Sequence, residues 1–99
     1  MPIIDVRSHV VAEGKYAEAV DWLKKVIHHL NSQNIKARVL SPINGDMDEI
    51  FAVAEFESLA AMEEFGGAFF KSDKWTKDLS KGLPGLFTSS VRYQHRIVE

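Results

Sequence analysis

Hydrophobic and polar residues alternate along several segments of the chain and recur every three or four residues along others. Alternation places successive side chains on opposite faces of a strand, whereas the longer spacing places apolar side chains along one side of a helix. The pattern predicts strands at Ile3–Ala12, Lys36–Ile43, Glu49–Phe56 and Phe87–Val98, and helices at Tyr16–Asn31, at Leu59–Phe65 and, after a break at Gly66-Gly67, from Ser72 to Gly82. The resulting β-α-β-β-α-β order is typical of the α+β, ferredoxin-like sandwich, which carries both helices on one sheet face.

The segment Glu49–Phe56 is apolar on both of its faces. Ala52 and Phe56 would point to one side, and Phe51 and Val53 to the other. Both sides must then be covered, and the predicted helices suffice for only one. We therefore expect the second cover to be another copy of the chain, which gives a homodimeric α/β barrel.

Charged residues are expected on the sheet face that the helices leave bare. If Ile4, Val6 and Val10 face the helices, the opposite face carries a mixed polar set, which comprises Asp5, Arg7, His9, Arg38, Arg92, Gln94 and Arg96. Phe51 and Val53, or the residues of opposite parity, would join them. Such a mixture suits a partly wet cavity shared between two facing sheets, and ordinary surface ion pairs are the alternative.

Length, charge and cysteine content restrict the class of protein. The chain has 99 residues, which suits a single domain spanning 1–99, and a net charge of −2. No Lys/Arg cluster could follow a phosphate backbone, so nucleic acid is not an expected partner. The absence of cysteine removes disulfides and thiol chemistry. The sequence shows neither a membrane span nor a signal peptide, so we expect no membrane partner and a cytoplasmic location.

No metal site is predicted from the histidines. His9 and His95 lie on antiparallel neighbouring strands, at positions that would be far apart within one subunit. His28 and His29 are adjacent on a helix and point about 100° apart, which does not suit a shared metal ion. His9 alone could titrate near neutral pH and act as a base, and a histidine that merely lines a cavity or the surface is the alternative.

Several short motifs from Gly45 onward resemble the NIPSNAP-like branch of the dimeric α/β-barrel superfamily. The chain reads Gly-Asp-Met-Asp-Glu-Ile before a strand, Glu-Ser-Leu at the start of a helix, and Ser-Asp-Lys-Trp ending at Trp75. The family shows a similar G-x-L-[ND]-E-V turn and a DPxW segment, with Met47 and Lys74 differing here. The resemblance implies a homodimer with facing sheets and no cofactor, and it transfers no catalytic residue.

Aromatic and basic residues suggest a binding site in that barrel. Trp75, with Phe65, Phe69 and Phe70, could form a wall for a flat ligand, and core packing is the alternative. We expect ligand binding by Arg7, His9, Arg38, Trp75 and Arg92, and His9 and Trp75 are the candidate catalytic residues. The expected function is binding of a small hydrophobic or anionic molecule in the barrel.

Three other functions remain open from the sequence. Relatives of the same architecture include cofactor-independent monooxygenases, which suggests a quinol or an aromatic polyketide as substrate. The start MPIIDV resembles oxalocrotonate-tautomerase-like proteins, in which Pro2 would be the base once Met1 is removed. A purely structural or interaction protein would have side chains filling its interior.

Overall fold

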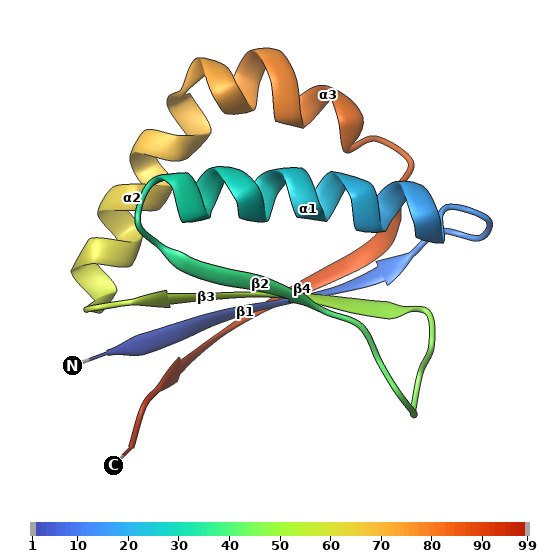
Figure 1. Cartoon of the computed structure of the whole chain (residues 1–99), viewed down its shortest axis with the longest axis horizontal. Helices are drawn as coiled ribbons and strands as arrows, with labels where there is room; N and C mark the ends of the chain where they lie inside the picture. Colours follow the sequence, from blue (N-terminus) through green and yellow to red (C-terminus); the bar gives the residue numbers. More distant parts are fainter. Residues whose placement is uncertain (1, 99) are drawn as a thin grey trace.

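The computed structural model describes residues 2–98 as a sheet covered on one face by helices (Figure 1). In chain order the elements are β1 (Ile3–Val11), α1 (Tyr16–Ser32), β2 (Lys36–Leu40), β3 (Glu49–Phe56), α2 (Leu59–Lys71), the π-helical segment η1 (Lys74–Leu79), the short α3 (Ser80–Gly82) and β4 (Phe87–Arg96). This is the predicted β-α-β-β-α-β order. Within the described residues, no helix is long and apolar enough to cross a membrane.

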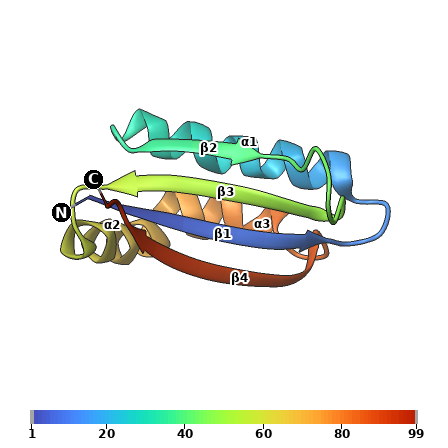
Figure 2. The same ribbon diagram turned by 90° about the horizontal axis from the view of Figure 1, so that it is seen from below.

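The strands form one antiparallel sheet in the order β2-β3-β1-β4, which Figure 2 shows from the side opposite the helices. This order places β1 and β3 at the centre and β2 and β4 at the edges. The predicted ferredoxin-like α+β fold is therefore confirmed. Both helical segments lie on what we call the covered face, and we call the opposite side the bare face.

The helix α1 follows its predicted stripe. Ala19, Leu23, Ile27 and Leu30 are buried against the sheet. The chain then turns at Asn34, whose φ of 65° lies in the left-handed region that asparagine tolerates. The end of α1 is thus fixed where the polar residues of the sequence predicted it.

The helix α2 is longer than predicted. The side chain of Ser58 accepts a hydrogen bond from the Ala61 backbone N–H at 3.1 Å, which confirms the predicted N-cap. The helix then continues through Gly66 and Gly67 to Lys71, so the predicted break is wrong. Each glycine costs roughly 1 kcal/mol in a helix. Burial of Met62 and Phe69 on the same side of the helix offsets that cost.

The predicted face of β1 is also wrong. Asp5 and His9 are buried on the covered face, at 6% and 9% exposure. The register places Asp5 opposite Ala54 and Arg7 opposite Ala52. These small alanines leave unfilled volume beneath the helices, and the polar side chains of β1 occupy it. Arg92 and Gln94 of β4 pair with Arg7 and Asp5 and therefore lie on the covered face too.

The bare face consequently carries apolar residues. The cross-strand partners of Val6 are Val53 on one side and Tyr93 on the other. Tyr93 is 50% exposed. The bare face comprises Ile4, Val6, Ser8, Val10, Lys36, Arg38, Leu40, Glu49, Phe51, Val53, Glu55, Ser89, Val91, Tyr93 and His95. Arg38 lies there as predicted. Of the two alternatives left open for β3, the structure places Phe51 and Val53 on this face.

Candidate functional site

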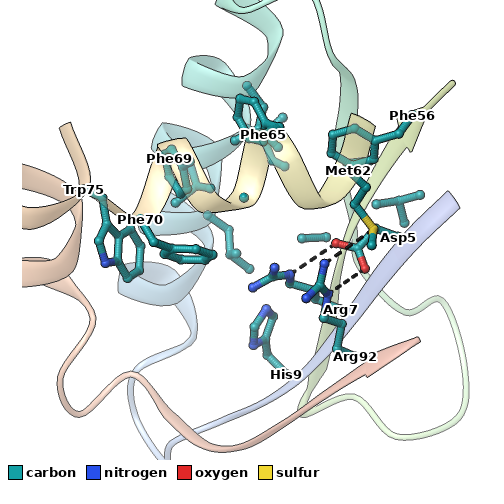
Figure 3. A pocket seen from close by; sticks show the side chains of 18 of the residues that line it. Asp5, Arg7, His9, Phe56, Met62, Phe65, Phe69, Phe70, Trp75 and Arg92 are labelled. Atoms are coloured by element: carbon teal, nitrogen blue, oxygen red, sulfur yellow. Dashed lines mark hydrogen bonds and ion pairs between the residues drawn. The ribbon is translucent and has the colours of Figure 1, made fainter. Parts of the chain in front are cut away.

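A pocket of ≈ 100 Å³ lies inside the protomer, between the covered face of the sheet and the helical layer (Figure 3). The strands β1 and β4 supply its polar side chains, whereas β3, α1, α2 and η1 supply its apolar ones. The cavity was predicted between two facing sheets, on the bare face. The polar residues of β1 that were expected to line such a cavity point instead toward the helices of their own protomer.

One end of the pocket is a cluster of polar side chains around Asp5, which we call the polar cluster: Asp5, Arg7, Arg92 and Gln94. The Oδ1 atom of Asp5 accepts hydrogen bonds from Arg92 Nε at 2.9 Å and from Gln94 Nε2 at 3.0 Å. Its Oδ2 atom accepts one from Arg7 Nε at 3.4 Å. The buried carboxylate orients two guanidinium groups through their Nε atoms, and the two arginine side chains remain partly exposed.

His9 lies beside the polar cluster and points into the pocket (Figure 3). Its Nδ1 is 2.7 Å from the Ser90 hydroxyl oxygen, and its ring stacks on Phe87 with centroids 4.5 Å apart. Burial, and then the positive charge of Arg7, lowers the pKa of the His9 imidazole below its ordinary value of 6.5. The ring is therefore neutral at pH 7. A neutral imidazole held at Nδ1 can exchange a proton or a hydrogen bond through Nε2.

The other end of the pocket is an aromatic wall formed by Phe65, Phe69, Phe70 and Trp75. The rings of Phe65 and Phe69 stack at 5.6 Å with an interplanar angle of 11°, and Phe70 meets Trp75 edge to face at 5.0 Å. The uninterrupted α2 carries the three phenylalanines over the sheet. The guanidinium carbon of Arg7 lies 5.7 Å from the Phe70 ring centroid, so the aromatic wall and the polar cluster meet there.

Trp22 of α1 fixes the position of η1, which carries Trp75. Its indole Nε1 donates to the Leu79 carbonyl oxygen at 2.7 Å, and its ring lies 6.2 Å from that of Trp75. A Cβ atom added at Gly82 would lie 2.8 Å from Trp22 Cδ1, so the indole packs directly on the backbone of α3. A π-helix leaves irregular carbonyl positions, and this hydrogen bond satisfies one of them.

The sequence-predicted residues separate into two groups in the structure. Arg7, His9, Trp75 and Arg92 line the pocket together, whereas Arg38 lies on the bare face. Asp5 was not predicted as a site residue. Its carboxylate lies two residues before Arg7, on the same face of the strand, which could have suggested it. Pro2 is exposed, outside the pocket. Within residues 2–98, no three His, Asp or Glu side chains converge as a metal site would require.

Comparison with known proteins identifies the fold. A NIPSNAP family protein from Agrobacterium tumefaciens superposes with a TM-score of 0.84 at 16% identity, covering 100% of this chain and 95% of that chain. An uncharacterized NIPSNAP domain protein from Burkholderia xenovorans gives a TM-score of 0.81 at 9% identity, with coverages of 97% and 94%. No protein-family model and no curated protein sequence matches the chain.

A third solved structure has the same fold. It is a dimeric protein of unknown function with a ferredoxin-like fold from Bacteroides fragilis, at a TM-score of 0.70 and 15% identity, covering 97% of this chain and 96% of that chain. At such identities the likeness shows the fold alone. The chain therefore has the NIPSNAP-like, ferredoxin-like fold that its motifs predicted.

Proposed function

We propose that residues 1–99 form one domain that assembles as a homodimer and binds a small hydrophobic or anionic molecule in a pocket of each protomer. The observation that carries the proposal is the juxtaposition of a polar cluster and an aromatic wall in one cavity. A pocket lined by apolar and aromatic side chains with a few convergent polar groups is the usual form of a small-molecule site. The cavity also argues against a purely structural role.

The bare face supports the homodimer. An exposed sheet face that carries apolar side chains among a few charged ones is a common protein-interaction site. The connection between β2 and β3 projects on the same side (Figure 1), and its Ile43 and Met47 are 95% and 56% exposed. Two bare faces packed together would cover Val6, Val53 and Tyr93 in both copies. A monomer by sedimentation velocity, at concentrations where dimers of this size form, would refute the assembly.

Blocking the cavity tests the binding proposal. A Cβ atom added at Gly66, which lines the pocket, or at the exposed Gly67 meets nothing within 4 Å. We expect Gly66→Leu to place its side chain in the pocket and Gly67→Leu, the matched control, to place it in solvent. Compounds that raise the melting temperature of wild type and of the control should fail to raise that of Gly66→Leu. A panel of small apolar and anionic compounds that shifts none of the three proteins would refute binding.

A second candidate function is a cofactor-independent monooxygenase that acts on a quinol or an aromatic polyketide. The specific observation in its favour is His9, a neutral imidazole beside an aromatic wall. Such a base could take a phenolic proton and so prepare an electron-rich ring for reaction with oxygen. Oxygen uptake that depends on a quinol and is lost in His9→Gln would support this activity. Absence of uptake across a quinol panel would remove it.

The cytoplasmic location expected from the sequence is likewise a proposal. Cell fractionation with an antibody against the untagged chain tests it, and recovery of the chain outside the cytoplasmic fraction would refute it.

A further inference from the structure

The polar cluster carries one net positive charge. The two guanidinium groups of Arg7 and Arg92 face a single carboxylate, Asp5, and His9 is neutral at pH 7. An uncompensated charge beside an apolar cavity is unfavourable. A monoanion bound there would neutralise the cluster, whereas a dianion would leave an excess negative charge.

The hydrogen bonds of the cluster leave suitable donors for that anion. Asp5 engages the Nε atom of each arginine, which leaves the terminal amino groups. Arg92 Nη2 instead contacts the Met62 sulfur at 3.4 Å, and a thioether is a weak acceptor. Arg7 and Arg92 side chains are 36% and 44% exposed, so an entering molecule can reach them. A planar carboxylate matches the geometry of guanidinium groups.

The aromatic wall sets the size and shape of the rest of the molecule. An apolar cavity of about 150 Å³ holds one benzene. The pocket here, at ≈ 100 Å³, is smaller than that cavity, so it accommodates no more than a single ring. Phe70 lies 5.7 Å from the Arg7 guanidinium carbon, and Trp75 lies edge-on to Phe70. A ring packed on these side chains would hold a directly attached substituent close to the arginines.

We propose that the pocket binds a monoanionic carboxylate carried on a single aromatic ring. The carboxylate lies on the terminal amino groups of Arg7 and Arg92, and the ring packs against the side chains of Phe70 and Trp75. This inference rests on the small-molecule binding proposed above and adds the chemical class of the ligand. Phosphate esters and neutral rings are the competing classes.

Three probes of similar size distinguish these classes: benzoate, neutral benzamide, and phenyl phosphate, which is mainly a dianion above pH 7. The chain has two tryptophans, so a ¹H–¹⁵N spectrum contains two indole signals, and Trp75→Phe assigns them. The Trp75 signal then reports occupancy of the pocket. We expect benzoate to shift it at concentrations at least tenfold below those that benzamide or phenyl phosphate requires.

Arg7→Gln is the most informative variant, because Asp5 retains Arg92 and Gln94 as partners. We expect it to weaken the binding of benzoate roughly ten- to hundredfold and to leave the binding of benzamide nearly unchanged, since an arginine–carboxylate contact is charge-assisted. Arg7→Lys, which keeps the charge but loses the planar group, should fall between. Arg38→Gln is the matched control on the bare face, where the same change should leave benzoate binding unaltered.

The outcomes distinguish failure of this inference from failure of the proposed small-molecule binding. Equal affinity for benzoate and benzamide, unaffected by Arg7→Gln, would overturn the carboxylate and leave small-molecule binding intact. Tighter binding of phenyl phosphate would overturn the monoanion. If none of the three probes shifts the Trp75 signal, the inference is overturned. If the wider compound panel used with Gly66→Leu also shows no binding, the proposed small-molecule binding is overturned as well. A dispersed spectrum of each variant verifies that it is folded.

Discussion

Along β1 and β4 the two faces of the sheet differ in a way opposite to the usual arrangement. There the covered face carries Asp5, Arg7, His9 and Arg92 beside an apolar core, whereas the bare face carries valines and aromatic residues such as Tyr93. Helices normally cover apolar strand residues, and water normally meets polar ones. The covered face therefore retains a mainly apolar cavity with a polar end, which suits a small molecule, and the bare face presents exposed apolar side chains that suit a protein partner.

Residue size on β3 explains the difference. Ala52 and Ala54 of β3 lie opposite Arg7 and Asp5 on the covered face, whereas Val53 lies opposite Val6 on the bare face. The alanines leave unfilled volume beneath α1 and α2, and the polar side chains extend into it. A few small residues thus determine which side of a sheet can hold a cavity.

The largest effect is expected from a charge on the bare face. Val6→Asp would bury an unpaired carboxylate in each half of the proposed dimer interface, at a cost of roughly 3 kcal/mol or more. We expect the dimer dissociation constant, measured by sedimentation velocity, to rise at least hundredfold. Val6→Thr, which keeps the shape and strand preference, should weaken the dimer far less. A Val6→Asp dimer as stable as wild type would show that the bare face is not the interface.

The next effect concerns the carboxylate of the covered face. Asp5→Asn removes the charge that holds Arg7 and Arg92 and places an amide among donors. We expect the free energy of unfolding to fall by roughly 2 kcal/mol, as for other hydrogen bonds to charged groups. Urea unfolding measures it, and Glu63→Gln on the exposed side of α2 should change it by less than about 0.5 kcal/mol. If Asp5→Asn had the same free energy of unfolding as wild type, the charge of Asp5 would contribute nothing to stability.

Acid should lower the free energy of unfolding, because it protonates His9 on the covered face. Because burial and Arg7 lower the pKa of His9 in the folded protein, the unfolded state binds more protons below the ordinary value of 6.5. Stability should therefore fall as the pH drops from 7 through 6.5 and below. His29 acts in the same direction, since its pKa is lowered mainly by burial and also by Lys74 and His28.

Urea unfolding at a series of pH values tests this dependence. His9→Gln should flatten the decline below pH 6.5, and His29→Gln should flatten it less. An identical pH dependence in His9→Gln and wild type would contradict the assignment of the decline to the covered face.

The smallest effect concerns the two glycines of α2. Neither has a positive φ, and a Cβ atom at either meets nothing within 4 Å. Gly67→Ala should therefore raise the free energy of unfolding by roughly 0.5–1 kcal/mol through helix propensity alone. Gly66→Ala should raise the free energy of unfolding by a similar amount, but it should also narrow the pocket and weaken the binding of benzoate. If both variants bound benzoate equally well, Gly66 would not face the occupied part of the cavity.

Element type and order could be predicted from the sequence, because periodicity determines both. The bounds of Glu49–Phe56 match β3, and the stripe beginning at Tyr16 matches the start of α1. The face of β1 could not be predicted. Its even-numbered residues are the more apolar set, and the alternation alone gives no reason for the polar set to be covered. The deciding feature was the alanines of another strand, whose register is a tertiary property.

The candidate site was predicted in part for a similar reason. The motif ending at Trp75 and the nearby phenylalanines indicated an aromatic wall, and the arginines of β1 and β4 indicated an anion site. Their meeting in one protomer depends on α2 continuing through Gly66 and Gly67, against local helix propensity. Arg38 has the same chemistry as Arg7 but lies on the other side of the sheet.

The number of small molecules bound per dimer tests the central claim most directly. Native mass spectrometry of the untagged protein, titrated to saturation with benzoate or carrying a co-purified molecule, counts them. A pocket between the covered face and the helices of each protomer predicts a dimer with two molecules. A saturated dimer with one molecule would place the site between two facing sheets instead and contradict the division of roles between the two faces.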